Sequence, residues 1–293
     1  MGSSVGQNLM SLTPTKESYP VAEVWTAIER IWRLEDARQY ALSGPLNIEF
    51  ALKHGLTQHT FRENLWAFLN DIFSVDPSLR SQLATAIKGN DSEFRRFLHF
   101  YQTNLRQHHR RSELTILTEY FDSFNEHRQV FAYVRTGAPL PKSAKATSTD
   151  FQTVKSFYAH AFEFFASQLC ILTCLNNILD GRKFDQLKNI ALAKYLETDK
   201  AKRPQSIANN NEFAMFIKEF DSNIRNASAH NWFFLKQDNA TIEYRSGGTG
   251  ALNELSYTDY LYKCGNLMRQ ICNLMILELE LDQIACDLAV VSR

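Results

Sequence analysis

The sequence predicts an all-α protein that carries one small β-hairpin, and three observations support this fold class. Apolar residues recur at helical spacing along most of the chain, as residues 21–42 illustrate. Strand-like runs are confined to about residues 232–236 and 241–244, which the turn Gln-Asp-Asn separates. Residues 137–150 are rich in Pro, Ser, Thr and Ala. We therefore expect a helical N-terminal domain, a linker and a C-terminal helical bundle.

The N-terminal half is expected to be helical throughout, with Gly-Pro, Asp-Pro and Gly-Asn-Asp supplying breaks and caps. Helices are expected over about residues 21–42, 58–73, 76–87, 91–107 and 112–133. The first residues have neither a basic nor an apolar targeting segment. We therefore expect a disordered start over residues 1–14, an N-terminal helical domain over 15–136 and a linker over 137–150.

The C-terminal part, residues 151–293, is expected to form four helices with the hairpin inserted after the third. The helices are expected over about residues 151–179, 184–197, 211–229 and 257–290. Within the first of these, residues 157–179 are apolar enough to suggest a membrane span, but they include Glu163, Gln168 and Asn176. Such groups are costly in lipid and tolerated in a bundle, so a buried helix and no membrane contact are expected.

Composition limits the classes of function. Lys and Arg together number 32 and so do Asp and Glu, so a contact with nucleic acid must come from local basic patches. The five cysteines all lie in apolar helical segments, which favours buried thiols in a reducing compartment. A cytoplasmic protein is expected.

The chemistry concentrates in the segment Arg225-Asn226-Ala227-Ser228-Ala229-His230, which ends the helix expected over 211–229. Arginine can clamp a phosphate, the amide can orient a neighbour, and histidine can transfer a proton near neutral pH. Positions five apart on a helix differ by about 140° in direction, so Arg225 and His230 would not share a face. Either the helix ends or bends between Ala227 and His230, or a second subunit completes the site.

This segment resembles the Arg-polar-x(3)-His signature of the HEPN families (higher eukaryotes and prokaryotes nucleotide-binding), in the C-terminal half only. The resemblance implies a helical bundle with the motif at the end of the penultimate core helix, and a homodimer through the C-terminal domain. It also implies a metal-independent endoribonuclease, in which the 2′-hydroxyl of RNA attacks its own phosphate and leaves 2′,3′-cyclic phosphate and 5′-hydroxyl ends. His230 would transfer the proton, Arg225 would neutralise the phosphoryl charge, and Asn226 would orient His230 or the substrate. No metal or cofactor is expected.

The biological role follows only by analogy with that family. Members with an extra helical domain are often toxins or antiviral defence effectors that cleave transfer, messenger or ribosomal RNA, and the class admits an antitoxin or regulatory partner. In one branch a tyrosine two residues after the histidine is nucleotidylated, and Trp232 occupies that place here. The alternatives are a non-catalytic HEPN-type dimeric module that binds a nucleotide or a protein, and a helical scaffold unrelated to these families.

Basic residues outside the motif are candidates for RNA binding. The densest cationic run, residues 106–111, contributes Arg106, Arg110 and Arg111, and the loop before the motif helix contributes Lys202 and Arg203. An ordinary amphipathic helix with a basic solvated face explains the first group as well. Glu163 either pairs with Arg225 or lies at a solvated edge of the bundle.

Overall fold

The computed structural model of the chain describes residues 69, 78–230, 232–245 and 250–291. The start predicted to be disordered and the helices expected over 21–42 and 58–73 lie outside these residues, apart from Leu69.

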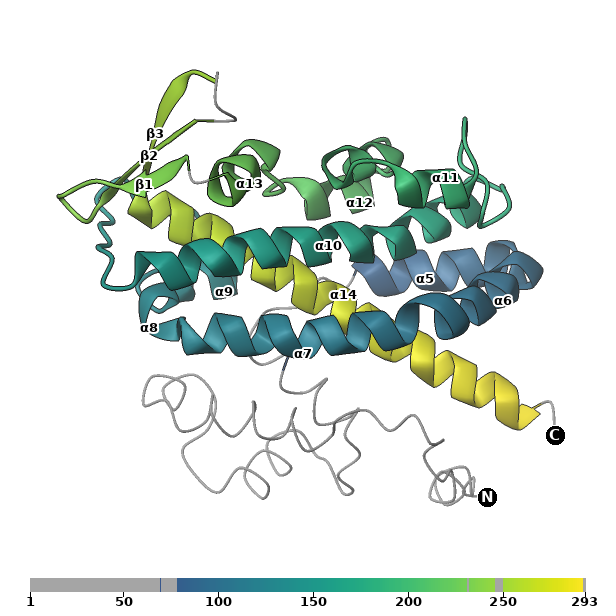
Figure 1. Cartoon of the computed structure of the whole chain (residues 1–293). Helices are drawn as coiled ribbons and strands as arrows, with labels where there is room; N and C mark the ends of the chain where they lie inside the picture. The colour runs from purple at the N-terminus through teal and green to yellow at the C-terminus, as the bar shows by residue number, and fades with distance from the viewer. Residues whose placement is uncertain (1–68, 70–77, 231, 246–249, 292–293) are drawn as a thin grey trace, which may run out of the picture.

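Three long helices form the centre of the molecule (Figure 1). Helix α10 (Phe151–Leu179) lies beside α7 (Arg106–Asp122), and α14 (Tyr257–Val291) crosses both. Shorter elements surround them: α5 (Ser78–Gly89), α6 (Asp91–Phe100), the π-helical turn η3 (Tyr101–Leu105), α8 (Phe124–His127), α9 (Phe131–Thr136), α11 (Leu192–Glu197), the 3-10 helices η4 (Lys200–Ser206) and η5 (Met215–Ile217), α12 (Asn211–Ala214) and α13 (Ser222–Ala229). The expected helical architecture is confirmed for the described residues.

Helix α10 spans the residues predicted for it because its start is capped and most of its length is apolar. Asp150 accepts hydrogen bonds from the backbone N–H of Thr153 at 3.3 Å and from its hydroxyl at 2.6 Å. By length and hydropathy this helix could cross a membrane, but 83% of its most apolar window is buried inside the protein. It is a core helix that exposes only a narrow edge, which includes Gln152 and His160.

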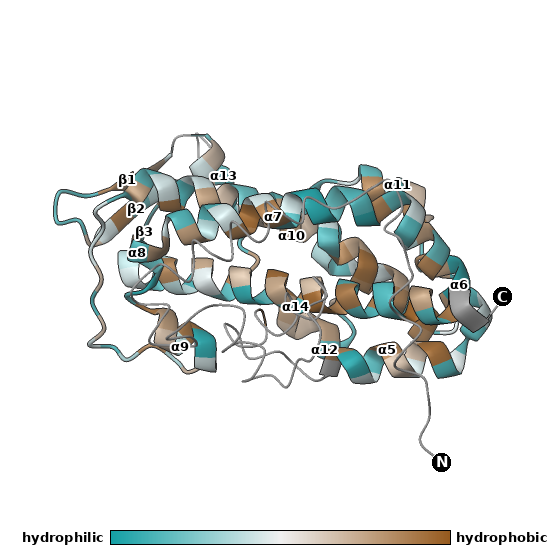
Figure 2. Ribbon diagram, turned by 90° about the horizontal axis from the view of Figure 1, so that it is seen from below, coloured by the Kyte–Doolittle hydropathy of each residue, from teal (hydrophilic) through white to brown (hydrophobic). Residues whose placement is uncertain are grey.

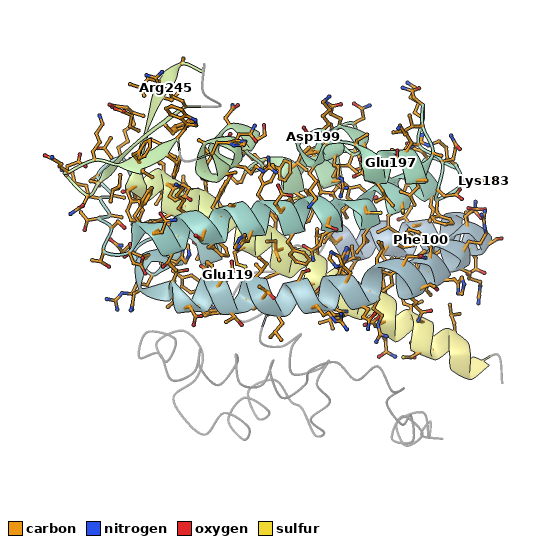
Figure 3. All side chains as sticks on the ribbon, in the orientation of Figure 1. Phe100, Glu119, Lys183, Glu197, Asp199 and Arg245 are labelled. Atoms are coloured by element: carbon orange, nitrogen blue, oxygen red, sulfur yellow. The ribbon has the colours of Figure 1, made fainter. Side chains whose placement is uncertain are left out.

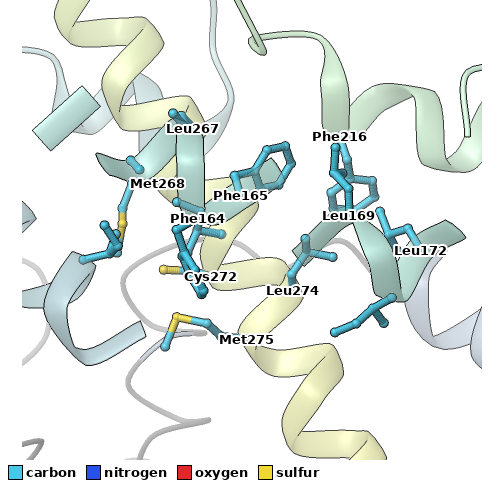
Figure 4. Packing of buried hydrophobic residues seen from close by; sticks show 14 of the residues in the cluster. Phe164, Phe165, Leu169, Leu172, Phe216, Leu267, Met268, Cys272, Leu274 and Met275 are labelled. Atoms are coloured by element: carbon cyan, nitrogen blue, oxygen red, sulfur yellow. The ribbon is translucent and has the colours of Figure 1, made fainter. Parts of the chain in front are cut away.

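The core is centred on α10 and α14 and extends to buried residues of α5, α6, α7 and η5. Figure 4 shows Phe165 and Leu169 of α10 beside Leu274 of α14, with Phe216 of η5 near Leu169. In Figure 2 the apolar residues gather along these central helices, and the loops beside the sheet are polar. Gly265 allows close packing of α9 on α14, since a Cβ there would lie 2.6 Å from Val134 Cγ2.

The predicted hairpin is present as β1 (Phe233–Leu235) and β2 (Thr241–Arg245), and β3 (Leu252–Ser256) completes an antiparallel three-stranded sheet in the order β1-β2-β3. The sequence of β3, Leu-Asn-Glu-Leu-Ser, lacks apolar alternation, which is why sequence patterning missed it. Phe233 and Ile242 are buried and attach the sheet to the bundle.

Three expected helices are divided or shorter than predicted. The segment 112–133 is divided among α7, α8 and α9, and α7 already begins at Arg106. The segment 184–197 is helical only over α11, because a bridge between Gln186 and Ala191 forms a turn before it. The segment 211–229 is divided into α12, η5 and α13. The division follows from Asp221, whose carboxylate caps a new helix and accepts from the N–H groups of Asn223 and Ile224.

The segment predicted to be a linker, residues 137–150, is held in place by hydrogen bonds. Glu126 accepts from the backbone N–H of Thr149 at 2.8 Å and of Asp150 at 2.9 Å, and the N–H of Ala146 donates to Thr258 at 2.8 Å. Within the described residues, helices from both sides of this segment share one core. The segment is therefore a fixed connection and not a flexible tether.

A buried carboxylate, Glu278 of α14, joins the helices of the two halves. Gln168 Nε2 donates to its Oε1 at 3.2 Å, Tyr101 donates to its Oε2 at 3.2 Å, and His109 Nδ1 lies 3.1 Å from Oε1. All four side chains are buried. Burial alone would lower the pKa of His109, but the charge of Glu278 raises it above the ordinary value. Burial opposes ionisation of Glu278, yet the charges of His109 and Arg110 hold its pKa below the ordinary value.

Two residues that were expected to bind RNA instead form ion pairs next to this network. Arg110 is 3% exposed and bonds to Glu113 at 2.8 Å and to Asp282 at 3.0 Å. Arg106 pairs with Asp282 at 2.9 Å. The run 106–111 does not lie along one solvated face, because η3 inserts a π-helical turn before it, which rotates later positions away from uninterrupted α-helical phase.

Replacing Glu278 by glutamine is expected to destabilise the fold most strongly at mildly acidic pH. His109 contributes stability fully below its unfolded pKa of 6.5 and loses it as pH rises through the raised folded pKa. Glu278 contributes stability above its unfolded pKa of 4.5 and loses that contribution as pH falls through its lowered folded pKa. Denaturant unfolding of Glu278→Gln should therefore show a loss of about 3 kcal/mol near pH 5.5 and a smaller loss near pH 9.

Asp287→Asn, which changes an exposed carboxylate on the same helix, is the matched control for this measurement. An equal loss for Glu278→Gln at both pH values would contradict an ionised pair.

Candidate functional site

The motif helix α13 is held against α10 by apolar contacts and a cap. Ile224 and Ala227 are buried, and the ring of Phe220 stacks on Phe162 of α10 with centroids 3.8 Å apart. The hydroxyl of Tyr158 donates to the carbonyl of Asp221, the capping residue, at 3.3 Å. These contacts fix the helix on the surface of the bundle (Figure 1).

The helix ends just before His230, in agreement with the first of the two alternatives that the sequence left open. Ala229 is its last residue, and His230 follows with φ −104° and ψ 19°. The N–H of His230 donates to the carbonyl of Asn226 at 3.1 Å, and that of Trp232 donates to Ala227 at 2.9 Å. The chain then turns into β1. The side chain of His230 is exposed, and it makes no hydrogen bond or ion pair with another residue that the structure describes.

Arg225 is oriented by three neighbouring groups. Its Nε donates to Glu163 Oε1 at 2.6 Å, and the adjacent guanidinium nitrogen contacts the same oxygen. The remaining nitrogen donates to Asn226 Oδ1 at 2.8 Å. The guanidinium carbon lies 5.9 Å from the centre of the Phe162 ring. The planar fork is therefore preset, although the structure places no direct bond between Arg225 and His230.

Glu163 connects the motif with a second cation that sequence reasoning missed. Lys200 Nζ lies 2.8 Å from Glu163 Oε2, so one carboxylate holds both Lys200 and Arg225. Burial raises the pKa of Glu163, but the hydrogen bonds and charges of Lys200 and Arg225 outweigh it and lower the pKa overall. Asp199, labelled in Figure 3 on the same side of α10 as α13, starts η4 and so sets the direction of Lys200.

Lys200 lies in the same loop as Lys202 and Arg203, which the sequence predicted to bind RNA. Lys202 is exposed and remains a candidate, whereas Arg203 is 7% exposed and donates to the carbonyls of Ala166 at 3.1 Å and Leu196 at 2.8 Å. Arg203 is therefore a structural residue, contrary to the expectation. In the 3-10 helix η4 positions three apart share a face, so Lys200 and Arg203 both contact α10, at Glu163 and at the carbonyl of Ala166, and Lys202 lies on another face.

The remaining candidates for RNA binding, in the run 106–111, lie in different environments. Arg111 is exposed on α7, whereas Arg110 is buried in the network around Glu278. Arg106 is half-buried and paired. The cationic run therefore offers one clearly exposed arginine.

No cysteine pair or metal-ligand cluster accompanies the motif in the part of the chain that the structure describes. Four cysteines are buried, the fifth is half-buried, and all five are free thiols. No group of three or more His, Cys, Asp or Glu side chains among the described residues has the arrangement to hold a metal ion.

No family model matches the chain, and neither a curated protein nor a solved structure gives a match. The site is therefore interpreted from its own residues and geometry.

Glu163→Gln is expected to reduce stability at neutral pH by about 0.5–1 kcal/mol, because a partly exposed carboxylate that holds two cations contributes modestly. The lowered pKa means that this contribution is present above the unfolded value of 4.5 and is lost as pH falls through the folded value. The difference from the unchanged protein should therefore vanish in acid, as measured by denaturant unfolding between about pH 3 and 7.

Glu197→Gln removes an exposed pair with Lys194 and serves as the control. A smaller effect for Glu163→Gln than for Glu197→Gln would show that the carboxylate does not anchor the site.

Proposed function

We propose that the chain is a metal-independent endoribonuclease of the HEPN type, with Arg225, Asn226 and His230 as its catalytic residues. The observation that carries the proposal is the end of α13, where an oriented arginine and an exposed histidine follow each other within one helical turn and a half. An arginine held by its Nε side still presents donors to a phosphoryl oxygen, and an exposed imidazole can reach a ribose hydroxyl.

The proposed reaction needs two proton transfers. The 2′-oxygen forms a bond to phosphorus and loses its proton, while the bond from phosphorus to the 5′-oxygen breaks and that oxygen gains a proton. One His230 can serve one of these steps in a single event, as base or as acid. A homodimer through the C-terminal domain would supply a second His230 for the other, which supports the proposed dimer. Arg225 and Lys200 would stabilise the charge on the phosphoryl oxygens.

The proposed biological role is that of an RNA-cleaving toxin or antiviral defence effector acting in the cytoplasm, with transfer, messenger or ribosomal RNA as target. It rests on the family analogy. The alternative, a non-catalytic HEPN-type dimeric module, draws support from the pairing of Arg225 with Glu163, since an arginine neutralised in this way can serve structure alone.

The test is incubation of the purified full chain with total RNA in excess EDTA, followed by analysis of the product ends. We expect 2′,3′-cyclic phosphate and 5′-hydroxyl termini. His230→Ala should lower the rate by about 10²- to 10⁴-fold, the range for loss of a general acid or base. Arg225→Lys, which keeps the charge and loses the planar fork, should lower it by about 10²-fold or more.

His99→Ala, an exposed histidine on α6, is the matched control and should leave the rate unchanged. Unchanged cleavage by His230→Ala would contradict the assignment. A folded dimer without cleavage under any condition would favour the non-catalytic module.

A further inference from the structure

The outer face of the sheet exposes large apolar side chains next to the motif. Trp232 is 40% exposed, Phe234 is 54% exposed and Leu252 is 51% exposed. Together with Met215, at 42%, they are the exposed large hydrophobic residues of the described part of the chain. Three of these four therefore gather on one small sheet.

Strand register places them on the same face. Phe233 and Leu235 alternate with Phe234, and Phe233 is buried against the bundle, so Phe234 points outward. The N–H of Arg245 donates to the carbonyl of Trp232 at 3.0 Å, which continues the pairing of β1 with β2. Arg245 also pairs with Leu252 in β3. Trp232, Arg245 and Leu252 thus form one row across the sheet.

Charge divides this face into two parts. In the next row Phe234 pairs with Glu243, and Glu243 pairs with Glu254. Lys236 lies against both carboxylates and offsets one of their two negative charges, so that end of the sheet stays acidic. Arg245 makes no ion pair with another described residue, and Figure 3 shows it near the end of the sheet. The row nearest the motif is therefore aromatic, apolar and cationic.

This row lies beside the proposed catalytic histidine. Trp232 follows His230 by two residues, so their Cα atoms are at most about 7 Å apart. A nucleotide chain that reaches His230 would therefore pass close to the indole of Trp232. Aromatic rings bind the flat faces of unpaired bases, and an arginine plane does the same, whereas a duplex covers those faces.

We propose that Trp232, Phe234 and Arg245 form a base-stacking subsite that selects single-stranded RNA for the motif. The inference rests on the proposed function and extends it to the substrate class. Single-stranded RNA fits this face better than a separate protein partner, because Arg245 lies within the row and charged Glu243, Glu254 and Lys236 border the three apolar side chains.

The test is fluorescence anisotropy in EDTA with a labelled 2′-O-methyl oligonucleotide, which lacks the attacking hydroxyl and so reports binding alone. The unchanged protein should bind the single strand more tightly than the same sequence in a duplex. Trp232→Ala and Phe234→Ala should each weaken single-strand binding by about 5- to 100-fold and leave duplex binding unchanged. Phe234→Tyr, which keeps the ring, should retain binding, and Met215→Ala is the matched exposed apolar control.

Equal binding by Trp232→Ala and the unchanged protein would overturn the subsite. So would a conversion from dimer to monomer in sedimentation that accompanies the loss of binding, because the face would then be a protein interface. The outcome is separable from the proposed catalysis. If cleavage requires His230 but binding does not require Trp232, the subsite alone is contradicted. If binding requires Trp232 but no cleavage occurs, the nuclease alone is contradicted.

Discussion

The arrangement of the helices depends on one buried carboxylate, Glu278. An isolated ionised carboxylate in a protein interior costs several kcal/mol, so every group around it must be placed to compensate. Gln168, Tyr101 and His109 come from three separate segments and all converge on it. A helix that slid by one residue would separate the charge from its partners. The ion pair therefore fixes how α7, α10 and α14 pack, which apolar contacts alone would specify less sharply.

Helix α10 carries this constraint from the core to the surface. Gln168 faces the buried network, and Phe162 and Glu163, little more than one turn away, face the motif helix. Phe162 supports both the ring of Phe220 and the guanidinium of Arg225. Because one rigid helix supplies both sets of contacts, the position of the arginine is set by the core and not by a loop.

The carboxylate of Glu163 has two consequences for the chemistry at α13. It orients Arg225 and collects Lys200 from a distant part of the chain, which gathers cations beside an exposed histidine. It also neutralises part of their charge, so under the proposed function a phosphate would share these cations with it. The arginine is thus oriented in advance, and under the proposed function a substrate that brings additional contacts, such as bases stacked on the neighbouring sheet, would be favoured.

The sequence by itself determined the helical class, the extent of α10 and α14, the hairpin and the position at which α13 ends. Those features depend on local periodicity and capping, which neighbouring residues encode. The sequence left two alternatives for Glu163, and the structure shows the one in which it pairs with Arg225. Only the tertiary structure decided that Lys200, and not Arg203, faces the motif, that Arg110 is buried, and that β3 joins the sheet. These outcomes depend on a π-helical turn, a 3-10 turn and contacts between residues more than a hundred positions apart, none of which leaves a periodic signal in the sequence.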